Sequence, residues 1–116
     1  MKIFKSFNIL NKEINYNKSI GFVPTMGCLH EGHLSLIKSA KLKSKLVLVS
    51  IFINPTQFND KKDFIKYPRN LKKDINILKR LKVDYLFLPS VDEIYKKNVK
   101  KKIKLNIKDK ILCAKY

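Results

Sequence analysis

Apolar residues along this chain follow two patterns, short continuous runs and repeats at three- or four-residue spacing. The runs predict β-strands at 20–23, 46–53 and 84–88, and the middle run is rich in branched side chains, as in a strand buried on both faces. The spaced repeats predict one helix through 34–40 and another over 70–81. Because strands that alternate with helices form parallel sheets, the pattern predicts an α/β protein with a Rossmann-like open parallel sheet.

The flanks of this strand–helix unit carry weaker signals. Residues 7–14 predict a short amphipathic helix, and Pro24 is expected to close the first strand. Residues 90–93 have the pattern of a helix cap, and beyond Lys96 alternating lysine and isoleucine predict an edge strand or a hairpin. Right-handed crossovers place both connecting helices on one face of the sheet, so we expect the opposite face to be left bare.

The length and composition indicate one domain, residues 1–116, with enough apolar material for a core, since 45% of the residues are hydrophobic. No apolar stretch approaches the roughly 20 residues that a membrane-spanning helix needs, and the N-terminus lacks the apolar core of a secretory signal. Cys28 and Cys113 lie too far apart for a zinc cluster or a disulfide framework, so Cys28 is read as loop filling and Cys113 as a small buried residue. We expect a reduced, cytoplasmic protein without a membrane segment.

The formal net charge is +17, from 26 Lys and Arg against 9 Asp and Glu. Such an excess raises the question of a nucleic-acid partner. However, nearly all of it is lysine, spread from Lys2 to Lys115 and densest at 96–104, and only Arg69 and Arg80 supply a guanidinium. This distribution argues against a dedicated nucleic-acid role and fits a solvated surface that attracts small anions.

The loop from Pro24 to His33 leaves the first predicted strand at the end where open parallel sheets bind ligands. His30 and His33, the chain's two histidines, share one face if both lie in the first turn of the following helix. Unpaired N–H groups at that helix start would attract phosphate, the imidazoles could donate hydrogen bonds to it, and Gly32 would let a flat nucleotide ring approach. The alternatives are that the two histidines only cap the helix or bind a metal adventitiously.

The loop after the second strand carries Asn54 and Gln57. Their neutral donors and acceptors suit the hydroxyl and carboxylate groups of a small acid, or they cap their own loop. Further on, Arg69 could clamp an anion or lie on the surface. Cys28 is not interpreted as a nucleophile, because no general base has an assigned place beside it.

Four blocks of residues together cover essentially the whole chain. The blocks are Gly21–Gly27 with Leu29–His33, Val49–Phe58, Tyr67–Leu71, and Leu86–Ser90 with Glu93–Tyr95. They resemble the pantothenate synthetase (pantoate–β-alanine ligase) family. A histidine–glycine–histidine motif alone is shared with many adenylyl-transferring enzymes and class I aminoacyl-tRNA synthetases, whereas the four blocks together are specific.

The resemblance implies a nucleotidyltransferase-type fold and a two-step ligase reaction. Pantoate attacks the α-phosphorus of ATP, with Mg²⁺ present, and the amine of β-alanine then displaces AMP. It assigns His33 as the catalytic proton donor with His30 beside it on the phosphates, and Gln57, supported by Asn54, to pantoate and β-alanine. The ATP-binding loop would comprise Met26, Gly27, Cys28, Leu29, His30, Glu31, Gly32 and His33. The resemblance implies no protein-bound metal, and it implies a possible homodimer.

The chain departs from the family pattern after residue 110. Family members are much longer, and their downstream lysine and arginine motifs are not in this sequence. Ile111–Tyr116 resembles the lead-in to a further family block, of arginine, proline, glycine, histidine and phenylalanine, with Ala114 in place of a glycine. We therefore expect an N-terminal nucleotide-binding domain, truncated at its C-terminal end, with negligible ligase activity alone. The alternatives are a non-catalytic remnant, retained for binding or without function, and a basic nucleic-acid-binding module.

Overall fold

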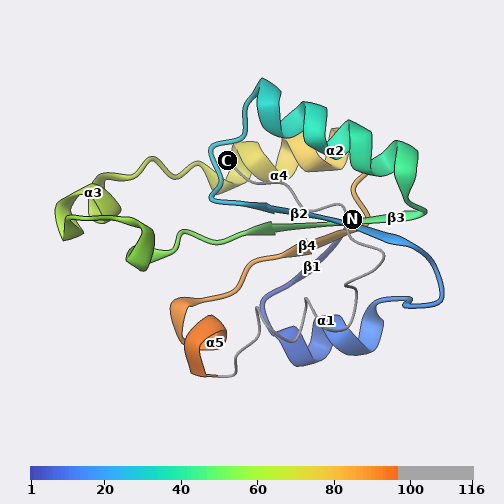
Figure 1. Ribbon diagram of the computed structural model, residues 1–116, viewed down its shortest axis with the longest axis horizontal. Helices are drawn as coiled ribbons and strands as arrows, with labels where there is room; N and C mark the ends of the chain where they lie inside the picture. Colours follow the sequence, from blue (N-terminus) through green and yellow to red (C-terminus); the bar gives the residue numbers. More distant parts are fainter. Residues whose placement is uncertain (97–116) are drawn as a thin grey trace.

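The protein, described by a computed structural model over residues 1–96, is built on one sheet of four parallel strands in the order β1-β4-β3-β2 (Figure 1). The strands are β1 (Lys2–Phe4), β2 (Ile20–Thr25), β3 (Leu46–Ile51) and β4 (Tyr85–Phe87). All three pairings are parallel, so the carboxyl ends of the strands share one edge of the sheet. The predicted open parallel α/β sheet is confirmed.

Helices cover both faces of this sheet (Figure 1). One face carries the two crossover helices, α2 (Glu31–Lys43) and α4 (Leu71–Arg80), as the right-handed crossover rule requires. The opposite face carries α1 (Phe7–Glu13) and α5 (Val91–Lys96). The expectation of a bare second face was therefore wrong, because the predicted helix at 7–14 is the element that covers it.

Side-chain alternation along β3 and β4 gives the sheet an apolar core on each face. On the α2–α4 side the fully buried residues include Val23, Ile37, Val49, Leu78 and Leu86. On the α1 side the buried residues include Phe7, Leu10, Ile20, Leu48 and Phe87. Apolar contacts on both faces explain why the middle strand reads as an unbroken hydrophobic run.

Pro24 was expected to close β2, but it lies inside the strand, paired with Ser50. Proline lacks an N–H and is tolerated where that group needs no partner. The strand order supplies such a place, because β2 is at the edge of the four-stranded sheet and has β3 on one side alone. The strand therefore continues to Thr25, two residues beyond the predicted strand of 20–23.

Several shorter elements differ from the sequence prediction. Strand β1 was not predicted, and the loop after β3 contains a 3₁₀ turn, η1 (Pro55–Gln57), and a helix, α3 (Lys61–Lys66). The predicted cap at 90–93 is confirmed, since the Glu93 amide donates to Ser90 Oγ at 3.2 Å. The strand or hairpin expected beyond Lys96, and Cys113, lie outside the described residues.

Candidate functional site

The two predicted site loops leave the sheet side by side. Thr25 and Ile51, the last residues of β2 and β3, are partners in register, and the Phe52 amide donates to the Thr25 carbonyl at 2.9 Å. The loop that leads into α2 and the loop that leads into η1 therefore start at the same carboxyl edge (Figure 1). This is the edge at which open parallel sheets bind ligands.

The two histidines form a reciprocal cap at the start of α2. His30 is the N-cap residue and is exposed, whereas His33 lies in the first turn and is buried. The His30 amide donates to His33 Nδ1 at 3.2 Å, and the Gly32 amide donates to His30 Nδ1 at 3.1 Å. The ring centroids are 4.1 Å apart. The structure thus brings the pair together and also shows the capping role given above as the alternative.

These hydrogen bonds fix where each imidazole carries its proton. A ring nitrogen that accepts from an amide N–H is unprotonated, so the proton of each neutral ring is on Nε2. Burial lowers the pKa of His33 from 6.5, the charge of His30 lowers it further, and Asp74 opposes the fall. At neutral pH, His33 is therefore a neutral donor through Nε2–H.

The backbone amides of this segment are largely occupied, in contrast to the open N–H groups expected at the helix start. Side-chain atoms accept from the amides of Cys28, Leu29, His30 and Gly32. At Gly32, moreover, a Cβ would lie 3.0 Å from His30 Cε1. The group next to this glycine is therefore the His30 imidazole, at the place where the sequence analysis expected a nucleotide ring. Four of the amides that precede or begin α2 are therefore already hydrogen-bonded to side chains.

Asp74 of α4 anchors the loop between β2 and α2 through two hydrogen bonds, a role that the sequence analysis did not predict. Its side chain is 3% exposed; Oδ2 accepts from the Cys28 amide at 2.9 Å and Oδ1 from the Leu29 amide at 3.0 Å. Asp74 follows Leu71 by three residues and precedes Leu78 by four, so it lies on the apolar face of α4. An aspartate at a core-facing position of a predicted helix is the sequence signal that could have revealed this role.

A left-handed turn joins β2 to this anchored segment. Gly27 has φ +81° and Cys28 has φ 54°, and the Gly27 amide donates to Thr25 Oγ1 at 3.1 Å. Positive φ is easily adopted by glycine and is strained for a residue with a Cβ. The Cys28 side chain is exposed at this turn. The turn reverses the chain within a few residues and so delivers His30 to the start of α2.

In the second loop, the two predicted residues are placed differently. Asn54 caps η1: its Oδ1 accepts from the Thr56 amide at 3.0 Å and from Thr56 Oγ1 at 2.7 Å. The self-capping alternative therefore describes Asn54. Gln57, in contrast, is exposed at the end of the turn.

Arg69 is engaged within its own segment. Its guanidinium donates to the carbonyls of Phe64, Ile65 and Tyr67 and lies 5.2 Å from the Phe64 ring centroid. The rings of Phe58, Phe64 and Tyr67 pack edge to face. Arg69 is exposed, as in the surface interpretation, and its hydrogen bonds stabilise the segment after η1.

Tyr67 brings this segment close to the anchored loop. Burial raises the pKa of the Tyr67 phenol, and the charges of Cys28 and Asp74 raise it further, whereas Arg69 lowers it. Electrostatic coupling to Cys28 and Asp74 requires that the phenol lies near the loop that precedes α2. The carboxyl edge is thus bordered by this segment as well as by the two strand ends.

A comparison with family models identifies the group of proteins to which these features belong. The model described as Pantoate-beta-alanine ligase matches residues 2–116. The chain belongs to this family. The resemblance inferred from the four sequence blocks is confirmed.

Curated relatives in the pantoate-beta-alanine ligase family are close in sequence but longer. Pantothenate synthetase of Fervidobacterium nodosum is 60% identical over 90 residues, which are 77% of this chain and 32% of the relative. That of Thermosipho melanesiensis is 43% identical over 119 aligned residues, 98% of this chain and 42% of the relative. The chain thus spans about a third to two fifths of these relatives.

Solved structures of the family have the same fold. Pantoate-beta-alanine ligase from Francisella tularensis, complexed with β-γ ATP and β-alanine, is 49% identical with a TM-score of 0.77, over 84% of this chain and 38% of that one. Pantothenate synthetase from Thermus thermophilus is 29% identical with a TM-score of 0.82, over 93% and 49%. The expected nucleotidyltransferase-type fold agrees with these neighbours.

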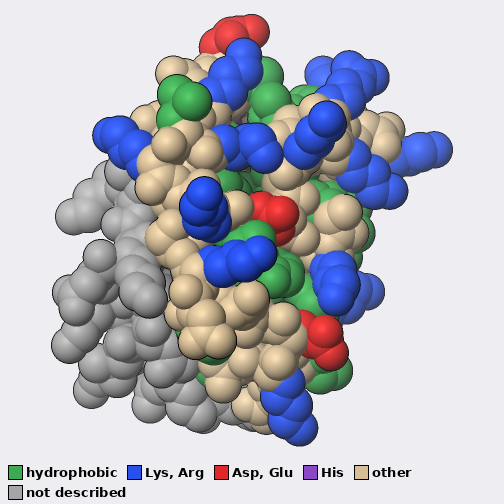
Figure 2. Space-filling view, turned by 90° about the vertical axis from the view of Figure 1, so that its right-hand side faces the viewer, with side chains coloured by type: hydrophobic (Ala, Val, Ile, Leu, Met, Phe, Trp, Pro, Cys, Tyr) green, Lys and Arg blue, Asp and Glu red, His purple; other side chains and the backbone are tan. Residues whose placement is uncertain are grey.

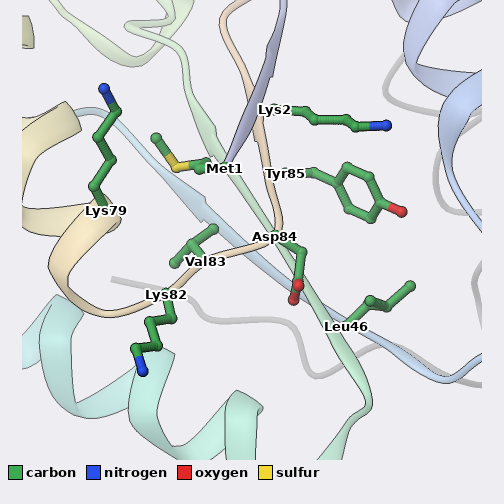
Figure 3. Close-up of a pocket in the computed structure, with 8 residues that line it drawn as sticks. All are labelled: Met1, Lys2, Leu46, Lys79, Lys82, Val83, Asp84 and Tyr85. Carbon is green, nitrogen blue, oxygen red and sulfur yellow. The ribbon is translucent and has the colours of Figure 1, made fainter.

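A separate cavity of about 490 Å³ lies at the amino ends of the strands, away from the family's sequence blocks (Figure 3). Its walls include Lys2, Lys79 and Lys82, whose side chains extend in different directions, and Asp84, whose Oδ2 accepts from the Val47 amide. The ammonium groups do not converge on a common point. None of the predicted site residues lines this cavity.

Two further properties concern the described part of the chain. Within residues 1–96, no group of three or more His, Cys, Asp or Glu side chains is placed to hold a metal ion. Every helix of the same residues is too short or too polar to cross a membrane. On the face drawn in Figure 2, lysine and arginine side chains are scattered among hydrophobic and other groups.

Proposed function

We propose that this chain forms the nucleotide- and pantoate-binding part of a cytoplasmic pantothenate synthetase. In the reaction, a carboxylate oxygen of pantoate attacks the α-phosphorus of ATP, and the bond to pyrophosphate breaks. The amine of β-alanine then attacks the acyl carbon of pantoyl adenylate, loses a proton and releases AMP. The family membership and the Francisella tularensis ligase, complexed with β-γ ATP and β-alanine, support the proposal.

The reciprocal cap of His30 and His33 is the observation that carries the proposal. Because Nδ1 of each ring accepts an amide N–H, the proton of each ring lies on Nε2, the atom that can donate to a phosphate oxygen. Such preorganised donors gain strength as negative charge develops on phosphorus-bound oxygens in the transition state. We assign this role to both rings, with Met26, Gly27, Cys28, Leu29, Glu31 and Gly32 as the surrounding ATP loop.

The second loop supplies the acid-binding side of the site. Gln57 is exposed at the carboxyl edge, and its amide can both donate to and accept from pantoate and β-alanine. Asn54 supports it indirectly, because Asn54 Oδ1 holds the 3₁₀ turn on which Gln57 lies. Because the two loops start from neighbouring strand ends, the proposal has the acid bound next to the α-phosphate.

We assign no protein ligand to Mg²⁺ and treat it as part of the Mg·ATP substrate. Asp74 is the buried carboxylate of this edge, and both of its oxygens already accept from backbone amides. Glu31 is exposed, and within residues 1–96 no group of three or more His, Cys, Asp or Glu side chains could hold a metal ion. The metal's contribution in the ligase is to neutralise charge on the phosphates.

The two histidines are the natural probes for a binding experiment, because the chain contains no others. We expect Mg·ATP, added to the full ¹⁵N-labelled chain, to shift both Nε2 resonances while Nδ1 stays unprotonated. A His33→Gln variant, which keeps an acceptor at the cap position, should bind ATP more weakly. Unchanged ring resonances at millimolar Mg·ATP would contradict the proposal and favour a non-catalytic remnant.

An activity assay tests the remaining part of the proposal. With pantoate, ATP and β-alanine, we expect negligible AMP release from the chain alone. The family's downstream lysine and arginine motifs are not in this sequence, and the loss of one positioned charged donor lowers the rate by a factor on the order of 10²–10³. Robust AMP release would contradict this expectation. Self-association of the domain is to be measured in the same preparation by sedimentation. Strong, salt-dependent RNA or DNA binding would instead support the nucleic-acid alternative.

A further inference from the structure

Asp74 is the buried carboxylate on which the histidine loop rests. It comes from α4, 45 residues beyond Leu29 in the sequence, and is 3% exposed. Its two oxygens each accept from one backbone amide, Oδ2 from Cys28 and Oδ1 from Leu29, at 2.9 and 3.0 Å. Hydrogen bonds to a charged acceptor are about twice as strong as neutral ones.

The anchored amides directly precede His30, so the carboxylate acts on the position of the imidazole pair. The loop turns left-handed at Gly27 and Cys28, and Asp74 Oδ2 would lie 3.2 Å from a Cβ at Gly27. Two fixed amides and a strained turn leave the chain little freedom before the helix begins.

We propose that Asp74 is a positioning residue of the ATP site, which fixes the His30–His33 pair by holding the amides of Cys28 and Leu29. The proposal rests on the proposed function, since the pair is taken to bind phosphate. Asp74 itself does not touch the nucleotide. Asp74 also occupies the amides of Cys28 and Leu29, which are therefore not donors to phosphate in the proposed site.

The negative charge of Asp74 has a second effect that a purely mechanical anchor would lack. It opposes the fall in the pKa of His33 that burial and His30 produce. The charge of Asp74 also acts on Tyr67, from the segment after η1, whose pKa burial, Cys28 and Asp74 raise and Arg69 lowers. A change at Asp74 should therefore be visible in the titration of His33.

Asp74→Asn tests the anchor directly. Asparagine has nearly the same volume as aspartate but replaces one acceptor oxygen by an NH₂ group, so two donors would face each other at one of the anchored amides. The matched control is Asp84→Asn. Asp84 Oδ2 also accepts from a backbone amide of another element, Val47, at 2.8 Å, but at the amino end of the sheet.

The experiment measures the titration and tautomers of both histidines by NMR, and Mg·ATP affinity, in the unmutated chain and the two variants. In Asp74→Asn, we expect the pKa of His33 to fall further and the Kd for ATP to rise about tenfold, as expected for a lost charged hydrogen bond. Asp84→Asn should leave both unchanged. Wild-type behaviour of Asp74→Asn, or equal effects in the two variants, would overturn the proposal.

Hydrogen exchange in the unmutated chain tests the anchor even if Asp74→Asn does not fold. The Cys28 and Leu29 amides belong to a loop, yet we expect them to exchange as slowly as amides inside α2. Exchange at the rate of an open loop would refute the anchor. These measurements need no nucleotide, so a chain that binds no ATP would refute the proposed function while the anchor is judged on its own.

Discussion

Replacing Gly32 by alanine should separate the stability of this chain from its affinity for ATP. Gly32 lies in the first turn of α2, where alanine favours the helix by up to about 1 kcal/mol. A Cβ there would lie 3.0 Å from His30 Cε1 and 3.3 Å from Nδ1, so the exposed ring must move. A shift of the ring by a few tenths of an ångström weakens the hydrogen bond from the Gly32 amide, and losing the N-cap altogether would cost about 1 kcal/mol. The two contributions nearly cancel.

ATP binding has no such compensation. If the Nε2–H of His30 donates to phosphate, its displacement removes a hydrogen bond to a charged group, worth about 1.5–3 kcal/mol. Because about 1.4 kcal/mol corresponds to a factor of ten in affinity, the Kd should rise at least about tenfold. Urea unfolding measures the stability, and equilibrium dialysis with labelled Mg·ATP measures the affinity.

Gly27→Ala is the matched control for this glycine. Its φ of +81° is unfavourable for alanine by about 1–2 kcal/mol, and a Cβ would lie 3.2 Å from Asp74 Oδ2 and from Ile51 Cγ2. This variant should therefore lose about 2 kcal/mol of stability, unlike Gly32→Ala. The reasoning is refuted if Gly32→Ala binds ATP with unchanged affinity although NMR shows a displaced His30 ring.

Three further variants or conditions test separate parts of the structure. Burial and, secondarily, His30 lower the pKa of His33 from 6.5, and Asp74 opposes this fall. The contribution of neutral His33 to the free energy of unfolding is therefore present above pH 6.5 and is lost as the pH falls through the folded-state pKa. A His33→Gln chain should lack this pH dependence in urea titrations. Arg69→Lys, which cannot reproduce the guanidinium fork to three carbonyls, should speed amide exchange at 64–69 about tenfold and leave α2 unchanged; equal exchange would contradict the role of the fork. Gly21→Ala would place a Cβ 3.0 Å from a side chain of α2 and should lower the free energy of unfolding by about 1–3 kcal/mol in urea titrations; an unchanged value would show that α2 can move away.

The main elements of the fold could be predicted because their apolar patterns are local and long. The run at 46–53 and the spaced repeats of α2 and α4 are visible within a short window of sequence. Strand β1, in contrast, has three residues and exists through its pairing with β4, which lies more than 80 residues away. Pro24 misled the prediction because its place at the edge of the sheet depends on strand order.

The candidate site divides in the same way. The two histidines could be found from their spacing and from their place after a strand, but their hydrogen bonds could not. Asp74 was missed because the atoms that make it meaningful, the amides of Cys28 and Leu29, come from another element. For Asn54 and Arg69, the sequence left two interpretations open, and the backbone groups within reach decide each one.

A consequence for phosphate binding follows from the amides that side chains already occupy before and at the start of α2. A helix start normally attracts phosphate through unpaired N–H groups, whose protons do not titrate near neutral pH. Here side chains accept from the amides of Cys28 and Leu29 before the helix and of His30 and Gly32 at its start, so in the proposed site the imidazoles contribute donors as well. Protonation of an imidazole adds a proton to Nδ1 and breaks the cap that orients it. The ring charge that would attract phosphate more strongly therefore disrupts the geometry, so we expect the proposed site to bind ATP with neutral histidines.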